Sequence, residues 1–310
     1  MPRSRTVGGD GVATAGRQAL RKLYSPWIRW RRARQRRDIS RILSRRDEPQ
    51  VYDSDELFGA LQGECQPCKE YGYDDYSTWR RGMERAVRVL CPSDLHVCGL
   101  EVLEAGCGDG MTGFAIATYG HRVTLVDLED WRDARARQLP LIRGDLCSRL
   151  SLAPDSFDLI VSFNTFEHVA DPQAAFLELV RVCRPGGHVY LDFGPLYASA
   201  LGLHAHRTIF VPYPQFLFSE GFIVAKLKEL GLTDLGRKRE NLQPLNRWRV
   251  RQFAGLWSAV GCALVSHVVE VDLAHLTYVK RFSGAFQGRG LTFEDVTTQG
   301  IRVILKKTGT

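Results

Sequence analysis

Three glycines alternate with short side chains in residues 104–110, EAGCGDG, directly after an apolar run. Glycine accepts backbone angles that other residues avoid and lets a ligand approach closely, so Gly106, Gly108 and Gly110 predict a tight turn at a binding site. The pattern predicts a buried strand before the turn and a helix that begins near Met111. Such a helix offers free N–H groups and the positive end of its dipole to a bound anion.

The same loop departs from two common phosphate-binding patterns. A dinucleotide loop, G-x-G-x-x-G, needs a glycine where this chain has Met111, and no G-x-x-x-x-G-K-[ST] is found here. The remaining pattern, E-x-G-x-G-x-G, resembles motif I of the class I S-adenosylmethionine-dependent methyltransferases. The resemblance implies S-adenosyl-L-methionine as the cofactor, with the loop against its amino-acid end. The cofactor residues that it implies in this loop are Glu104, Gly106, Cys107, Gly108 and Gly110.

Two acids further along the chain extend this predicted cofactor site. Asp127 ends the apolar stretch HRVTLVD and lies 17 residues beyond Gly110, close to the spacing of the ribose-binding acid in nucleotide folds. A carboxylate there can accept hydrogen bonds from both ribose hydroxyls. Asp145 follows a short strand within residues 139–146, and in the resembled family this acid, or the backbone beside it, meets the adenine amino group. The remaining predicted cofactor residues are Leu128, Leu146 and Asn164.

The later motifs of the chain also resemble those of a methyltransferase. The series F-D-x-I-x-S, E-H-V-x-D-P and R-P-G-G resembles the small-molecule, methyltransferase type 11-like branch of the family. We expect an α/β fold: a doubly wound, mostly parallel seven-stranded sheet of the Rossmann-like methyltransferase type, with an antiparallel last strand. Its later predicted elements are strand Phe157–Phe163, helix Pro172–Cys183, a turn at Arg184–Gly187, a fifth strand over HVYLDF, helix Asn246–Val260, strand Cys262–Val271 and strand Ile301–Lys306.

The chain divides into three predicted parts. Residues 1–50 form a basic, partly disordered and partly helical extension, residues 51–97 a helical lead-in, and residues 98–310 the methyltransferase domain. The stretches 196–245 and 272–299 fall outside the plan of the sheet. Ligands of open α/β sheets lie beyond the carboxyl ends of the strands, where insertions can cover them, so both stretches are predicted substrate lids.

The positive charge of the chain is concentrated in the extension. Residues 1–50 hold 14 Lys or Arg against 4 Asp or Glu, whereas the rest holds 28 against 31. Helical spacing of apolar residues among arginines, broken at Ser25–Pro26, predicts two helices. They could dock on the body, lie on an anionic membrane through residues 17–46, or contact RNA. We favour a solvated, partly helical extension that docks on the body or has no specific role, and we expect no nucleic-acid partner. Without a secretion signal or a membrane-length apolar run, we predict a cytoplasmic protein, with the inner membrane face as a candidate location.

The segment after the fourth strand favours an oxygen acceptor. Residues 162–165 read SFNT, where methyltransferases of amides or base amines usually carry N/D-P-P-Y/F/W. A hydroxyl must lose its proton as the methyl group arrives, and histidine titrates near neutrality, so the predicted catalytic residues are His168, His204 and His206. The arrangement P-L-Y…G-x-H resembles methyltransferases of bacterial polysaccharide and natural-product pathways. It implies a small molecule, or a sugar or glycan hydroxyl, as the acceptor.

Two patterns raise the question of a metal ion. Asn164, Glu167 and His168 resemble the E-x-x-E-H of ubiquinone-pathway O-methyltransferases, which can hold a divalent cation, but Asn164 stands where that pattern has its first acid. A C-x-x-C at residues 65–68 is followed by cysteines at positions 91 and 98. The six residues between the second pair exceed the spacing that zinc ribbons prefer. We therefore predict no metal and ordinary thiols.

Two other functions compete with the leading hypothesis of a methyltransferase acting on a hydroxyl. An RNA or protein methyltransferase, recruited through residues 1–50, would lose RNA binding but not cofactor affinity if these residues were deleted. A non-catalytic cofactor-binding scaffold is the third alternative. It has less reason to keep Glu104, Asp127 and Asp145 together.

Overall fold

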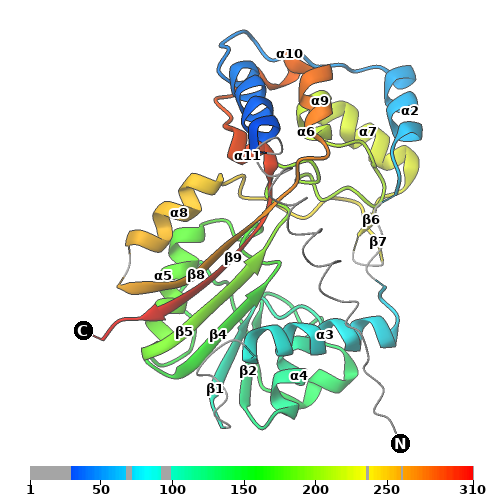
Figure 1. Cartoon of the computed structure of the whole chain (residues 1–310). Helices are drawn as coiled ribbons and strands as arrows, with labels where there is room; N and C mark the ends of the chain where they lie inside the picture. Colours follow the sequence, from blue (N-terminus) through cyan, green and yellow to red (C-terminus); the bar gives the residue numbers. More distant parts are fainter. Residues whose placement is uncertain (1–28, 68–71, 92–98, 235–236, 260, 310) are drawn as a thin grey trace, which may run out of the picture.

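A computed structural model describes residues 29–67, 72–91, 99–234, 237–259 and 261–309 around a seven-stranded sheet (Figure 1). The strand order is β3-β2-β1-β4-β5-β9-β8. Strands from β3 to β5 are parallel to their neighbours, and β9 runs antiparallel between β5 and β8. The predicted sheet with an inserted antiparallel last strand is confirmed. The strands are β1 Glu101–Ala105, β2 Arg122–Asp127, β3 Leu141–Arg143, β4 Phe157–Phe163, β5 Cys183–Phe193, β8 Cys262–Val271 and β9 Thr298–Lys307.

Helices cover both faces of the sheet because its central strands are apolar on both sides; all but one residue of β4 is buried. On one face, Ala86 and Ile116 of the helices α3 and α4 pack with Leu125 and Val161 of the strands. On the other face, Phe176 and Trp257 of α5 and α8 pack with further strand residues. These helices are α3 Asp75–Leu90, α4 Met111–Thr118, α5 Pro172–Val182 and α8 Val250–Ala259.

Two predicted boundaries near the end of the chain were wrong. The helix predicted from Asn246 begins at Val250 instead. Asn246 donates its side-chain amide to Phe166 O at 2.6 Å, and Arg247 has a left-handed φ of 60°, so this segment cannot continue the helix. The last strand begins at Thr298, earlier than predicted, because its first residues pair with the end of β8.

The predicted turn at Arg184–Gly187 lies inside β5 as a bulge. Phe157 of β4 pairs with Cys183, whereas Leu159 pairs with His188, so the four residues between loop out of register. The bulge lies at the amino-terminal end of β5, far along the strand from the carboxyl end. It therefore does not disturb the end of the sheet where ligands bind in this class of fold.

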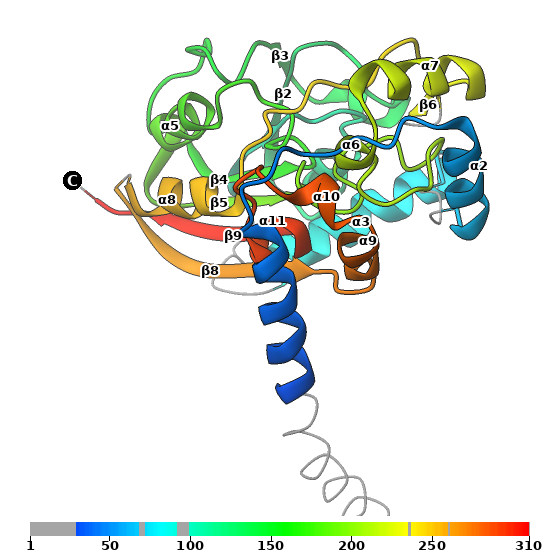
Figure 2. The same cartoon turned by 90° about the horizontal axis from the view of Figure 1, so that it is seen from above.

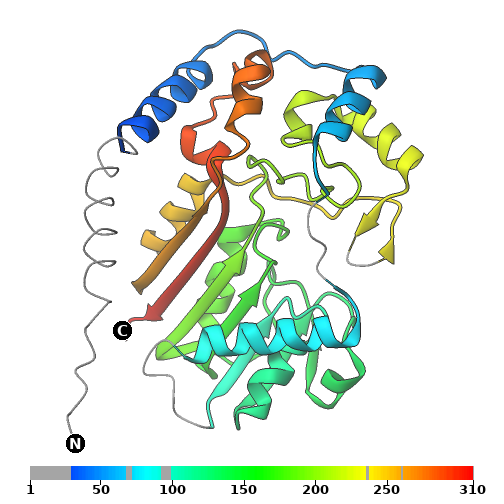
Figure 3. The same cartoon turned by 45° about the vertical axis from the view of Figure 1, so that its right-hand side comes forward.

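A second body of structure, which we call the cap, comprises residues 29–64, 196–245 and 272–297. It lies over the carboxyl ends of the parallel strands (Figures 1 and 3). Both predicted lids and part of the extension share its apolar core, which contains Ile39, Phe58, Tyr213 and Phe286. The cap elements are a helix over residues 29–43, α2 Asp55–Glu64, α6 Pro214–Leu217, α7 Glu220–Leu230, β6 Thr233–Asp234, β7 Arg237–Lys238, α9 Leu276–Arg281, α10 Ser283–Phe286 and α11 Phe293–Thr297.

The helix over residues 29–43 is anchored by its last turns and projects from the cap (Figure 2). Ile39 is fully buried, and Arg36 forms an ion pair with Glu294. The predicted disordered segment and first helix, within residues 1–28, lie outside the described residues. Among the helices that the structure describes, none is both long enough and apolar enough to cross a lipid bilayer.

Candidate active site

The glycine turn, Asp127 and the segment after β4 meet at the carboxyl ends of neighbouring strands. Gly106 and its successor donate their N–H groups to Val126 O, at 2.8 and 3.0 Å. Gly106 has a φ of 70°, and a Cβ atom there would collide with Thr165. Gly108 has a φ of 51°, but a Cβ atom there would meet no described atom within 4 Å. This part of the turn therefore faces open space that a ligand can enter.

Two carboxyl groups occupy the amino-terminal end of α4. Asp109 Oδ1 accepts a hydrogen bond from Met111 N at 3.0 Å, and Glu104 Oε2 accepts one from Gly113 N at 2.7 Å. The N–H groups that the sequence pattern offered to an anion are therefore largely taken by the chain's own acids. Burial raises the pKa of Glu104 to about 8, even though the bond from Gly113 lowers it. This donor set does not suit a pyrophosphate and fits a cofactor without phosphate, such as S-adenosylmethionine.

Asp127, at the end of β2, joins the glycine turn to the neighbouring strand. Its Oδ2 accepts a hydrogen bond from Gly108 N, and its Oδ1 accepts one from Leu128 N, both at 2.8 Å. Each carboxylate oxygen keeps a second lone pair, so both can still accept bonds from ribose hydroxyls. Gly144 N donates to Asp127 O at 3.0 Å, which brings the segment after β3 to the same place.

The other predicted cofactor residues surround this end of the sheet, and their roles remain predictions. Asp145 is exposed and accepts a hydrogen bond from Cys147 N at 2.9 Å. Asn164 is exposed, has a φ of 49°, and donates its backbone N–H to Asp192 O. Leu128 is 63% exposed at the surface, whereas Leu146 and Cys107 are almost fully buried and pack in the apolar cores.

A second group of polar side chains lies where the cap meets β4 and β5. Glu167, His168 and His204, which we call the polar cluster, each have a ligand-type atom within 4.8 Å of the others. The imidazole rings of His168 and His204 are 4.9 Å apart, edge to face. Burial lowers the pKa of His168, and burial together with His168 lowers the pKa of His204 to about 3. Both rings are therefore neutral at physiological pH and keep a nitrogen lone pair.

The third predicted catalytic residue, His206, precedes Arg207 in the chain. Arg207, Tyr73 and Arg81 form a group, which we call the bridge, between the cap and the glycine turn. Burial and the Arg207 guanidinium lower the pKa of His206, and its Nδ1 has no hydrogen-bond partner in the described part of the chain. Arg207 donates to Tyr73 Oη at 2.6 Å, and Arg81 donates to Asp109 Oδ2 at 2.7 Å. The Tyr73 ring lies within 5.5 Å of both guanidinium groups. The bridge therefore connects the cap to the residue that caps α4.

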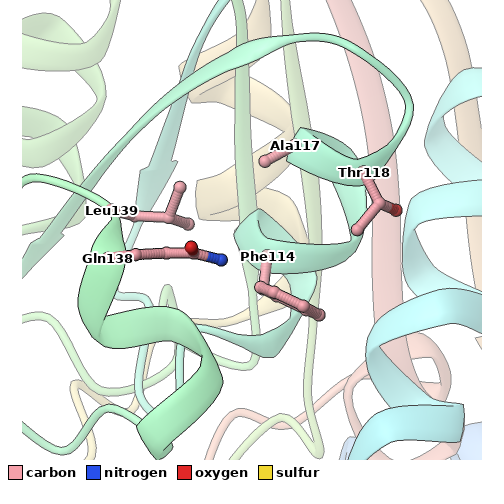
Figure 4. A pocket seen from close by; sticks show the side chains of 5 residues that line it. All are labelled: Phe114, Ala117, Thr118, Gln138 and Leu139. Carbon is pink, nitrogen blue, oxygen red and sulfur yellow. The ribbon is translucent and has the colours of Figure 1, made fainter.

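A surface hollow of about 370 Å³ lies away from all of these residues (Figure 4). Its walls come from α4 and from the residues just before β3, at the opposite end of that strand from Asp145. No predicted catalytic or cofactor residue lines it. The lining residues are Phe114, Ala117, Thr118, Gln138 and Leu139.

Sequence reasoning missed four residues that shape the site: Tyr73, Arg81, Asp109 and Thr165. Asp109 was visible as the acid inside the glycine motif, next to the start of a helix, where a carboxylate commonly caps N–H groups. The others act across 28 or more residues of chain, as in Arg81 to Asp109 and Thr165 to Gly106. No local spacing could have indicated these contacts.

Comparison with known proteins agrees with this geometry. Residues 103–191 match the model of a family described as a methyltransferase domain. An ubiquinone biosynthesis O-methyltransferase of Vibrio atlanticus is 30% identical over 161 residues, which cover 44% of this chain and 67% of that protein. A tRNA 5-carboxymethoxyuridine methyltransferase of Escherichia coli K12 is 33% identical over 123 residues, which cover 36% of this chain and 44% of that protein.

A solved structure of an S-adenosylmethionine-dependent methyltransferase from Mesorhizobium loti aligns with a TM-score of 0.43 and 20% identity, over 73% of this chain and 98% of that one. The chain spans only 37–43% of the length of three further curated relatives. The matched family segment contains the glycine turn, Asp127 and the segment after β4. On this match and the Vibrio relative, the chain belongs to the class I S-adenosylmethionine-dependent methyltransferases, and its cofactor is S-adenosylmethionine.

Proposed function

We propose that the protein transfers a methyl group from S-adenosylmethionine to a hydroxyl oxygen of a small molecule, sugar or glycan. The observation that carries this proposal is that the polar cluster joins the cap to the carboxyl ends of β4 and β5: Glu167 follows β4 and accepts from Gly194 N just after β5, and His204 of the cap donates to Pro195 O. His168 and His204 of this cluster, together with His206 of the cap, offer neutral nitrogen atoms to an acceptor hydroxyl. The Vibrio relative is named as an O-methyltransferase, which is consistent with an oxygen acceptor.

Methyl transfer to oxygen requires alignment, exclusion of water and removal of one proton. When bound, the cofactor supplies an electrophilic methyl group on a sulfonium. The chain's glycine turn and Asp127 hold the nucleoside and amino-acid parts, and the cap covers the acceptor. One of the three imidazoles, of His168, His204 or His206, accepts the hydroxyl proton. Because burial keeps these rings neutral, none needs to lose a proton first.

The test is a screen of candidate acceptors with methyl-labelled cofactor, beginning with sugars, lipid-linked glycans and phenols. We expect label in a methyl ether, located by mass spectrometry of the product. His206→Gln should then lower kcat much more than it lowers cofactor affinity. Label found only on nitrogen or carbon atoms, or equal kcat in the three single histidine variants and the wild type, would remove this proposal.

RNA methylation is a second candidate function, favoured by one surface feature. Seven arginines lie in the helix over residues 29–43, and every one of them is exposed. The E. coli relative is named for a tRNA substrate. If RNA is the acceptor, replacing the exposed arginines of this helix by glutamine, with the buried Ile39 kept, should abolish a salt-dependent affinity for tRNA and leave cofactor affinity unchanged. Binding of the same region to anionic vesicles, without RNA binding, would indicate peripheral membrane contact instead.

A further inference from the structure

We propose that the polar cluster is a binding site for a divalent metal ion of the Zn²⁺ class. Glu167 and His168 follow β4, and His204 comes from the cap, 36 residues later. Two imidazoles and one carboxylate are the protein ligands of many catalytic zinc sites, in which a further position stays open. Imidazole nitrogen also favours Zn²⁺ over Mg²⁺ or Ca²⁺, which prefer oxygen ligands.

The two imidazoles are oriented as metal ligands usually are. His168 donates Nδ1–H to Pro244 O at 2.8 Å, and His204 donates Nε2–H to Pro195 O at 2.7 Å. Metal-binding histidines almost always give their second ring N–H to a carbonyl or carboxylate, which fixes the ring and its tautomer. The two bonds therefore leave lone pairs on Nε2 of His168 and Nδ1 of His204, the nitrogens available to an ion.

The carboxyl group of Glu167 lacks a partner that an ion would supply. Glu167 is 3% exposed, and its Oε1 accepts a hydrogen bond from Gly194 N at 3.1 Å. Its Oε2 is buried and has no hydrogen-bond partner within the described ranges. The distance from Oε1 to His168 Nε2 is 4.0 Å, too long for a hydrogen bond. A buried polar atom left unpaired is costly, so a ligand that pairs it is favoured.

Small movements of side chains would complete the site. Ligand atoms of a tetrahedral zinc site, with bonds near 2.1 Å, lie about 3.4 Å apart, so separations of up to 4.8 Å in the cluster must shorten by at most about 1.4 Å. The side chain of His168 is 17% exposed and marks the side from which an ion can enter. The donor set differs from the E-x-x-E-H pattern, because His204 of the cap takes part while Asn164 replaces the first acid.

The open position of the ion would hold the acceptor's hydroxyl oxygen, an assignment that rests on the proposed function. When bound, Zn²⁺ would lower the pKa of a hydroxyl group at that position, which would make its proton easier to remove near neutral pH. His168 and His204 then act as ligands. Of the three predicted catalytic histidines, His206 is left to accept the proton.

The test measures metal binding by the full chain, without cofactor or acceptor, so that it is independent of the proposed function. Chelator-treated protein is titrated with Zn²⁺ by calorimetry and with Co²⁺ by visible absorption. We expect one ion per chain and a loss of affinity of at least 100-fold in Glu167→Gln and in His204→Asn. Asparagine suits position 204 because His204 has a left-handed φ of 60°. The matched control is His206→Gln, two residues from His204, whose affinity should stay within threefold of the wild type.

Three results would overturn the metal site. The first is no stoichiometric binding of either ion by the wild type. The second is equal affinity in the wild type and both ligand variants, which thermal melting must show to be folded; if one is not folded, the other decides. The third is a thiolate-to-cobalt absorption band that survives both substitutions, because the ion would then lie on cysteines. Metal binding without methyl transfer would instead leave the site standing and count against the proposed function alone.

Discussion

Polar side chains at the carboxyl end of the sheet and those near the cap find their hydrogen-bond partners at different distances along the chain. At the sheet end, Asp127 bonds Gly108 N and Glu104 bonds Gly113 N, so acids and backbone lie at most 19 residues apart. In the cap region, His168 reaches Pro244 across 76 residues, and the buried Glu167 Oε2 has no partner in the described structure. The acids of the cofactor half therefore bond backbone groups that lie close to them in the chain. The acceptor half is assembled from distant segments and leaves polar atoms for a ligand.

The largest effects are expected from removing one buried aromatic side chain from the apolar core of each half. Phe253 of α8, which packs on the sheet, and Phe286 of the cap are both fully buried, so either change to alanine should cost about 3–5 kcal/mol of unfolding free energy. Urea denaturation followed by tryptophan fluorescence measures the loss. We expect Phe286→Ala to loosen the cap and keep its affinity for the cofactor. Phe253→Ala should loosen the packing on the sheet and lose cofactor binding with it. Equal loss of cofactor binding would mean that the two halves do not respond separately.

A second test uses the pH dependence of two buried glutamates. Burial raises the pKa of Glu167 from 4.5 to about 8, so the metal-free folded protein holds an extra proton and loses stability as the pH rises through this window. Glu167→Gln should therefore be more stable than the wild type at pH 9, by about 1–3 kcal/mol, and level with it near pH 5.

The matched control for this test is Glu178→Gln. Burial would raise the pKa of Glu178, but bonds from Arg181 and Leu150 N outweigh it and lower the pKa. Its stabilisation is present above the ordinary pKa of 4.5 and is lost as the pH falls. The glutamine variant should accordingly be weaker than the wild type at neutral pH. If the stability of both variants, relative to the wild type, changed with pH in the same direction, the contrast between an unpaired Glu167 and a paired Glu178 would be wrong.

A third test places a methyl group on the open side of the glycine turn. Gly108→Ala adds a Cβ atom where no described atom lies within 4 Å, so it should lower S-adenosylmethionine affinity about tenfold, or 1.4 kcal/mol, by occupying ligand space. Gly120→Ala is the control, because Gly120 has an equally open surrounding and a positive φ of 88°. Calorimetric titration should show no change in the control. A matching loss in both variants would assign the effect to backbone strain.

The smallest expected effect comes from the bridge between the halves. Tyr73→Phe removes the hydroxyl that accepts from Arg207 and keeps the ring between the two guanidinium groups. One such bond contributes about 0.5–1.5 kcal/mol, so the melting temperature should fall slightly. Hydrogen exchange should rise at Arg207 and stay constant at Val126. An equal rise at both residues would show that the lost bond loosens the whole molecule and not the bridge alone.

The same contrast explains what the sequence could reveal. Motif spacing predicted the sheet, the glycine turn and the position of Asp127 at the end of a strand, because each depends on residues close together in the chain. It did not reveal that His204 would lie beside Glu167 and His168, nor that Tyr73 would join Arg207 to Arg81. These contacts depend on how the cap folds over the strand ends. The predicted start of the helix at Asn246 was wrong because the side chain of this residue bonds to Phe166 O, a distant backbone group.

We expect the carboxyl ends of the strands to hold S-adenosylmethionine between the glycine turn and Asp127. This expectation is tested most directly by calorimetric titration of the cofactor into Asp127→Asn. The matched control is Asp155→Asn. Asp155 precedes β4, at the end of the strand opposite the site, has a positive φ and accepts a hydrogen bond from Lys307. We predict a 10- to 100-fold loss of affinity in Asp127→Asn, about 1.5–3 kcal/mol, and none in the control. Unchanged affinity in Asp127→Asn would contradict the account.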